Sequence, residues 1–173
     1  MIVPTVTDVL KNIEYTLENV VKPTIVGTPI HTTVQTMGHL LRHATLRVEN
    51  EGQMLMDDGK RLRSLLASIH DYLTSVSSEP GCQTCMDSIS STLAQNFRDA
   101  DTYPTLISMG QEVGSLREAL YNALKQLQAM RNTHREEKAY IAIRQEIRDY
   151  LALQILDESA LVDPAFVGYG PRR

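Results

Sequence analysis

The sequence predicts an all-α protein, an antiparallel bundle of five or six helices, and three observations support this fold class. Apolar residues recur at helical spacing along most of the chain. No segment combines strand-like alternation with hairpin turn residues. Short stretches rich in Pro, Gly or Ser separate the periodic segments. A chain of 173 residues fits one domain. We therefore expect a single domain over residues 1–173, with an irregular tail at 157–173.

The first helix is predicted over residues 5–21. Thr5 or Thr7 can cap it, Lys22 suits its C-terminal end, and Pro23 is expected to stop it. Thr28 and Pro29 together mark the start of the next helix. The apolar stripe of the first helix consists of Val6, Val9, Leu10, Ile13, Leu17, Val20 and Val21.

Residues 30–76 carry two interleaved apolar series at seven-residue spacing. An unbroken helix of this length would measure about 70 Å, against a radius of gyration of about 16 Å for one compact domain of this size. We therefore expect a break at Gly52, giving helices over 30–50 and 53–76. A break at Gly59 and one continuous protruding helix are the alternatives. The first series is Val34, Leu41, Val48, Leu55, Leu62, Ile69 and Val76.

Three further helices are expected in the second half of the chain. A loop at 77–81 precedes a helix over 82–98, and Pro104 opens a strongly patterned helix over 104–132. The last helix is expected over 135–156. The charged runs 135–138 and 144–149 mix both signs, which is typical of a solvated helix face.

Composition limits the classes of function. The formal net charge of −4 and the pI near 5.7 disfavour a nucleic-acid binder. No apolar run reaches the length of a membrane span, and the N-terminus lacks a signal-peptide pattern, so we expect a cytoplasmic protein without membrane contact. No catalytic motif or cofactor motif is present, so neither catalytic residues nor cofactors are predicted.

His39 and His43 lie four residues apart, a spacing that can chelate a metal ion from one side of a helix. The phase of the apolar series places both on the outer, polar side. They are thus either an exposed pair without function or the ligands of a metal-dependent enzyme that adds a nearby carboxylate. No Glu-x-x-His motif supports a di-metal bundle.

Glu51 and Asp58 interrupt the second apolar series. A buried acid is costly unless it is paired or protonated. Either a fold-back places both acids at a helix end, where water reaches them, or they line a polar pocket with Arg47 and Glu49 that binds a small ligand.

Cys82 and Cys85 open a helix after Pro80 and Gly81. A helix N-terminus lowers thiol pKa, so a redox pair is possible. Two ordinary cysteines and a metal site are the alternatives, and two cysteines do not form the disulfide framework of a secreted protein.

A helix ending at Val20-Val21-Lys22-Pro23, followed by a linker and a helix ending at residues 47–52, resembles a family of small helical proteins. Members of that family have no assigned function and are encoded beside acyl-CoA dehydrogenase-like and aminoglycoside-phosphotransferase-like genes. The resemblance covers residues 1–75, and the family's usual Asn-Pro-Arg-Tyr ending is replaced by Val162-Asp163-Pro164. It implies a break near Gly52 and carries over no catalytic residue.

The expected function is therefore that of a non-enzymatic accessory or protein-interaction bundle, near acyl or small-molecule metabolism. It is expected to be a homodimer or to bind a protein partner, because the long Leu- and Met-bearing stripes offer more apolar surface than one bundle covers.

Overall fold

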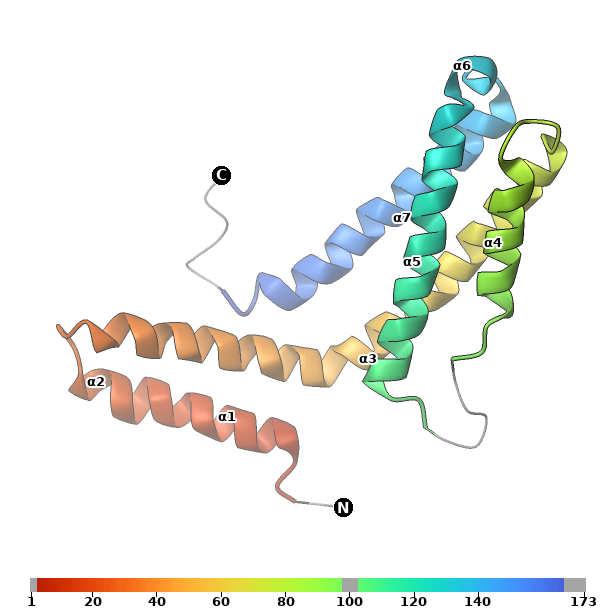
Figure 1. Cartoon of the computed structure of the whole chain (residues 1–173). Coiled ribbons are helices and arrows are strands. Elements are labelled where there is room, and N and C mark those ends of the chain that lie inside the picture. Colours follow the sequence, from red (N-terminus) through yellow and green to blue (C-terminus); the bar gives the residue numbers. More distant parts are fainter. Residues whose placement is uncertain (1–2, 98–102, 167–173) are drawn as a thin grey trace. The chain divides into compact units, whose positions relative to one another are not determined.

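The computed structural model describes residues 3–97 and 103–166 (Figure 1). Within those residues every regular element is a helix and none is a strand, so the prediction of an all-α helical bundle is confirmed. The elements are α1 (Val6–Thr16), the π-helix η1 (Leu17–Val21), α2 (Lys22–Thr24), α3 (Ile30–Ser75), α4 (Cys82–Ala94), α5 (Leu106–Ala129), α6 (Arg131–His134) and α7 (Lys138–Val162).

The chain divides into two compact units. Unit 1 comprises Met1–Gly52 and Ile155–Arg173, and unit 2 comprises Gln53–Gln154. The chain passes from unit 1 to unit 2 within α3 and returns to unit 1 within α7.

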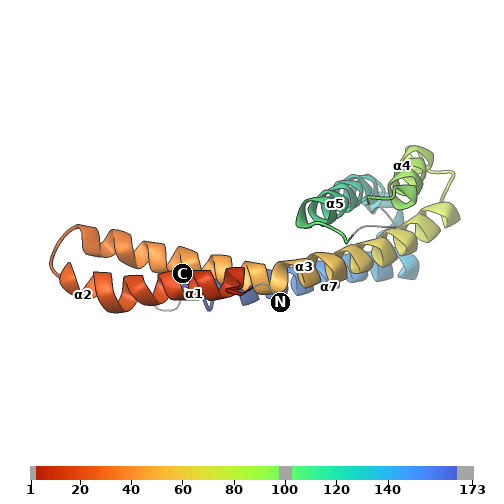
Figure 2. The ribbon, with the colours of Figure 1, turned by 90° about the horizontal axis from the view of Figure 1, so that it is seen from below.

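Unit 1 contains an antiparallel helical hairpin, in which α1 to α2 run beside the first part of α3 (Figure 2). Gly27 makes the turn between them with φ of +83°, a conformation that favours glycine. Ion pairs join the two arms: Lys11 Nζ lies 2.9 Å from Glu49 Oε1, and Arg42 Nε lies 2.6 Å from Glu14 Oε1. These pairings bring early residues of α1 to late residues of the α3 arm, which fixes the antiparallel register.

Thr5 caps α1, as one of the two predicted candidates. Its hydroxyl oxygen accepts a hydrogen bond from the Asp8 N–H, and the Asp8 carboxylate accepts one from the Thr5 N–H. This reciprocal pair is a capping box, which satisfies two backbone donors that the helix leaves free.

The prediction that Pro23 stops the first helix is wrong, because the helical path continues to Thr24. Proline has no N–H, and its ring crowds the carbonyl of the preceding turn. The π-helix over Leu17–Val21 widens the backbone just before Pro23, and the Lys22 N–H bonds to the Leu17 carbonyl five residues back. The wider turn accommodates the proline.

The predicted break at Gly52 is also wrong: α3 is continuous from Ile30 to Ser75 and passes through both Gly52 and Gly59. A glycine inside a helix costs only about 1 kcal/mol relative to alanine. Local contacts offset part of this cost, since Arg47 pairs with Glu51 and Gln53 donates to Asp57 along the same helix.

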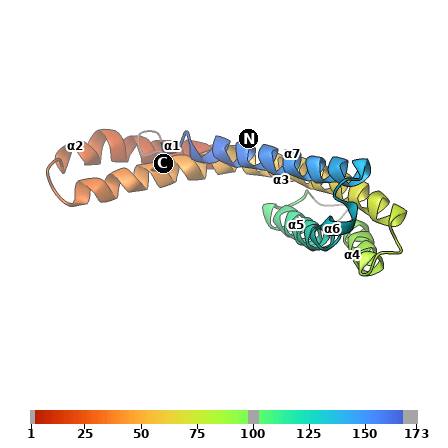
Figure 3. The same ribbon diagram turned by 90° about the horizontal axis from the view of Figure 1, so that it is seen from above.

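Unit 2 packs α4, α5 and its parts of α3 and α7 around an apolar core (Figure 3 shows α4 and α5 side by side). The predicted seven-residue series holds here, because Leu62 and Ile69 are fully buried. The largest fully buried side chains are Leu62, Leu66, Ile69, Leu73, Ile89, Leu116 and Leu127.

Several helix ends differ from the prediction. α4 ends at Ala94, earlier than expected, and α5 begins at Leu106 after the N-cap Thr105. α7 continues to Val162, beyond the expected end at residue 156, because Leu156, Ala160 and Leu161 favour helix. The predicted irregular tail is thus helical up to residue 162, and its part at 167–173 lies outside the described residues.

Candidate functional site

His39 contradicts the expectation that both histidines project outward, because it is only 8% exposed, while His43 is half-buried. The chain segment after α7 covers them. His39 Nδ1 lies 3.0 Å from the Ala165 carbonyl oxygen, and the Phe166 ring stacks on His39 at a centroid distance of 5.8 Å. Phe166 also contacts the His43 ring, at 5.9 Å. The pair therefore anchors this segment within unit 1.

The predicted polar pocket does not gather its four residues. Arg47, Glu49 and Glu51 belong to unit 1 and Asp58 to unit 2. Arg47 pairs with Glu51 along α3, and Glu49 pairs with Lys11 of α1. The alternative, a helix end where water reaches both acids, is wrong, because Glu51 and Asp58 both lie in the interior of α3.

Asp58 is buried in unit 2, where it pairs with an arginine of α5. Arg117 Nη2 lies 2.8 Å from Asp58 Oδ2. Burial, followed by the negative charge of Asp58, raises the pKa of Tyr150 to about 12. The Asp58 carboxylate on α3 thus interacts with residues of α5 and α7 within unit 2.

Sequence reasoning missed a second buried carboxylate, Glu112. Arg63 Nε and Nη2 both lie 2.9 Å from Glu112 Oε1. The same guanidinium donates to the Leu93 carbonyl oxygen at 2.8 Å and to the Gln95 carbonyl oxygen at 3.4 Å. Arg63 therefore joins α3, α5 and the C-terminal end of α4. Glu112 sits beside the apolar positions Met109, Val113 and Leu116, which is the one sequence signal of its burial.

Cys82 and Cys85 are free thiols, and both are buried. Burial raises the pKa of each thiol, so neither is held as the thiolate that redox chemistry needs. The Cys82 sulfur lies 3.7 Å from the Met130 sulfur and accepts a hydrogen bond from Gln126 at 3.6 Å. These contacts favour the interpretation of two core cysteines. Among residues 3–97 and 103–166, no group of three or more His, Cys, Asp or Glu side chains could hold a metal ion.

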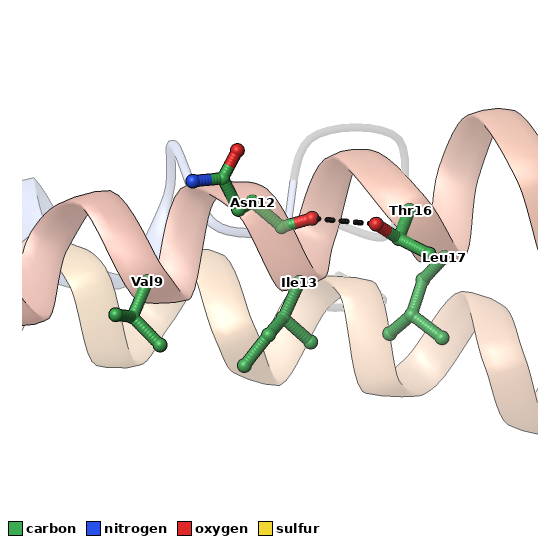
Figure 4. Close-up of a pocket in the computed structure, with 5 residues that line it drawn as sticks. All are labelled: Val9, Asn12, Ile13, Thr16 and Leu17. Carbon is green, nitrogen blue, oxygen red and sulfur yellow. Dashed lines mark hydrogen bonds between the residues drawn. The ribbon is translucent and has the colours of Figure 1, made fainter. Parts of the chain in front are cut away.

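The hairpin of unit 1 instead presents apolar surface. α1 buries none of its side chains, and Val6, Val9 and Ile13 are 43–64% exposed. Val9 and Ile13 line a shallow apolar depression, and both side chains project from one side of α1 (Figure 4). Met37, Leu40 and Val48 form a similar stripe on α3, at 47–56% exposure. We call these six residues the open face.

Both stripes of the open face lie on the same side of the hairpin. On α1, Ile13 immediately precedes Glu14, which pairs with the other arm. On α3, Val48 likewise precedes Glu49, and Met37 precedes the buried Gly38. One residue turns a helix by about 100°. In each arm the apolar residue comes one position before a residue that faces the other arm. Because the two arms run in opposite directions, this shared offset places both apolar stripes on one common side of the hairpin.

The opposite side of the hairpin is the covered one. His39 and His43 each follow, rather than precede, a residue that faces α1, and the Ala165–Phe166 segment lies on them. The neighbours Asn12, Thr16, Thr33 and Thr36 of the open face carry no charge, and the ion-paired Arg47 and Glu51 lie beside Val48 at one end of this face. A half-exposed apolar surface with few charges has the composition of the centre of a protein interface.

Among the described residues, no helix is both long and apolar enough to cross a membrane. Comparisons of the chain with models of protein families, with curated proteins and with solved structures found no match.

Proposed function

We propose that the protein is a non-enzymatic helical module that self-associates through the open face of unit 1. The observation that carries this proposal is the asymmetry of the hairpin: one side is covered by the Ala165–Phe166 segment, while the other exposes six large apolar side chains. Burying a Val, Leu, Ile or Met side chain completely contributes about 1.5–3 kcal/mol of free energy. Because these six side chains are about half-exposed, about half of that free energy remains to be gained on association.

A second copy of the chain is the occupant that fits this surface. An antiparallel hairpin with one apolar side is half of a four-helix bundle, and two such hairpins can pack face to face about a two-fold axis. A two-fold interface brings the same surface of two copies together, so each residue lies near its own symmetry mate or near a reciprocal partner. A surface with charges of one sign would therefore repel its copy. The open face avoids this because its centre carries no charge.

The non-enzymatic part of the proposal is supported by how the predicted site residues are used. Glu49, Glu51 and Asp58 are each engaged in an ion pair within the protein, and His39 holds the segment after α7. Each of these side chains thus has a partner within the protein, which favours a structural role. The setting in acyl or small-molecule metabolism rests on the sequence resemblance alone and stays a prediction.

Sedimentation equilibrium of the purified protein tests the proposal. The wild type should sediment at about twice the chain mass of 19.4 kDa. The double variant Ile13→Glu/Leu40→Glu should sediment as a monomer, because four carboxylates would then meet in the interface. Both positions are about half-exposed in the single chain, so the charges should leave its helical content unchanged.

The control is Ile107→Glu, which places one such charge on an exposed apolar residue of α5 in unit 2. It should remain a dimer. A monomeric wild type at micromolar concentration would refute self-association. A double variant that stays dimeric, or a control that dissociates equally, would refute the open face as the interface.

A further inference from the structure

A second surface, in unit 2, gathers positive charge that the sequence pattern had assigned to mixed, solvated faces. A groove of about 310 Å³ lies between α6 and α7. Its volume is at the lower end of the range typical of small-molecule sites. The groove is lined by Arg131, Arg135, Tyr140, Ile141, Arg144 and Arg148, so four of its six lining residues are arginines.

The fold holds this arrangement in place from both sides. Arg131 and Arg135 are four residues apart, as the first residue and the C-cap of α6, and Arg144 and Arg148 are four apart on α7, so the members of each pair project to one side. Tyr140 forms the floor: it is buried, and its hydroxyl donates to the Leu127 carbonyl oxygen at 2.9 Å.

The short α6 segment is fixed by His134. Its Nδ1 lies 2.9 Å from Glu137 Oε2, and its Nε2 lies 3.3 Å from Glu79 Oε1. The turn that joins α6 to α7 is therefore bound to the residues before α4, and the arginines on its two sides converge on the groove.

The arginines of the groove receive little charge compensation from the protein. In the part of the chain that the structure describes, no carboxylate pairs with Arg131, Arg144 or Arg148, and Arg135 has only the exposed Glu136, at 3.4 Å. By contrast, Arg42, Arg47, Arg63 and Arg117 each pair with a carboxylate. Arg144 is also half-buried.

Such a cluster has an energetic cost in the free protein. Like charges four residues apart destabilise a helix by a few tenths of a kcal/mol per pair, and the groove contains two such pairs. The chain as a whole has a formal net charge of −4, so the positive groove is a local exception. A cluster of guanidinium groups with little charge compensation is an arrangement that proteins use to bind phosphate groups.

We propose that this groove binds a small organic phosphate, with a diphosphate group as the part that the four arginines recognise. Guanidinium groups can bond phosphate oxygens in pairs, and two i,i+4 pairs match two adjacent phosphates. Tyr140 and Ile141 supply an apolar wall for the organic part. A nucleic acid fits less well, because the basic area is confined to one groove on an acidic protein.

Isothermal titration calorimetry at low ionic strength tests this proposal, with inorganic pyrophosphate and adenosine diphosphate as the probes. Both should bind saturably to the wild type. In the double variant Arg144→Gln/Arg148→Gln, affinity for either probe should fall at least about tenfold, since a hydrogen bond to a charged group is worth roughly one tenfold step or more. The thermal midpoint of the variant should not fall, because it loses like-charge neighbours rather than an ion pair.

The matched control is Lys138→Gln, which removes the same charge from an exposed position of α7 that does not line the groove. Its affinity should match that of the wild type. Absence of saturable binding, equal loss in both variants, or unchanged affinity in the double variant would each overturn the proposal. Tighter, variant-sensitive binding of a short single-stranded RNA would overturn the assignment to a small ligand.

Discussion

Replacing Arg63 by methionine should destabilise unit 2 by about 3 kcal/mol. The change removes an ion pair, in which two Arg63 nitrogens contact Glu112 Oε1, and the hydrogen bond to the Leu93 carbonyl oxygen. Breaking a buried pair from one side costs about 3–5 kcal/mol. The lower end applies here, because the Arg63 side chain is 33% exposed whereas that of Glu112 is 6% exposed.

The double-mutant cycle makes this prediction sharper. Glu112→Leu alone should cost only about 1–2 kcal/mol, because Arg63 can still reach water and the α4 carbonyls. The double variant Arg63→Met/Glu112→Leu buries two apolar side chains and leaves neither charge behind. It should therefore be more stable than the sum of the single changes implies, by a coupling of at least about 1.5 kcal/mol.

Hydrogen exchange followed by mass spectrometry is the suitable assay, because the chain has no Trp and exchange reports on each of the two units by itself. The amides of α4 and of the middle of α5 should lose most protection. The amides of α1, in unit 1, provide the internal reference. Single effects that add to the double effect within about 0.5 kcal/mol would refute the coupling, and a cost below about 1 kcal/mol for Arg63→Met would refute the buried pair itself.

Two further predictions concern stability measured by urea unfolding with circular dichroism. Gly59→Ala should stabilise the protein by about 0.5–1 kcal/mol, because an added Cβ would meet only Val113 Cγ2, at 3.8 Å, inside a helix; a lower urea midpoint would contradict this. Hydrogen bonding to Glu137 raises the pKa of His134. The stabilisation that protonated His134 gives the fold should therefore be complete below the pKa of an unfolded histidine, about 6.5. It should be lost as pH rises through the higher pKa of His134 in the folded protein. Wild type should be less stable at pH 8.5 than at pH 6, and His134→Gln should show a smaller change between these pH values; an equal change would exclude this residue.

Periodicity identified part of the core and the apolar faces of the helices. The seven-residue series identified Leu62 and Ile69 as core residues, and the stripe of the first helix contained Val6, Val9 and Ile13. A stripe, however, carries no information about what covers it. The sequence could therefore indicate Val6, Val9, Ile13 and Val48 of the open face, but not the fact that they remain exposed.

Features that depend on distant residues could not be predicted in this way. His39 is covered by Ala165, which is 126 positions away. Asp58 was noticed as an acid in an apolar series and Glu112 was not, but each is buried beside an arginine from another helix, which the sequence alone could not identify. The break at Gly52 was expected because an unbroken helix would be too long for a single compact domain. In the structure α3 belongs to two compact units, so its length needs no break.

The groove arginines illustrate an intermediate case. The two i,i+4 pairs were visible in the sequence, but acids lie beside them in both charged runs. The turn between α6 and α7 brings Arg131 and Arg135 to the same groove as Arg144 and Arg148, and none of the acidic residues that the structure describes lines that groove. The separation of positive from negative side chains therefore depends on the fold and could not be predicted from the sequence.

Because unit 1 is assembled from residues on both sides of unit 2, synthesis of the chain imposes an order on its folding. On the ribosome, His39 and His43 emerge long before Ala165 and Phe166, and all of unit 2 is made in between. Unit 2 can thus form its core while one side of the hairpin still lacks its cover. Contacts between residues so far apart in sequence are slow to form. During that interval the nascent hairpin exposes both of its sides, which is when it is most open to premature pairing with another copy.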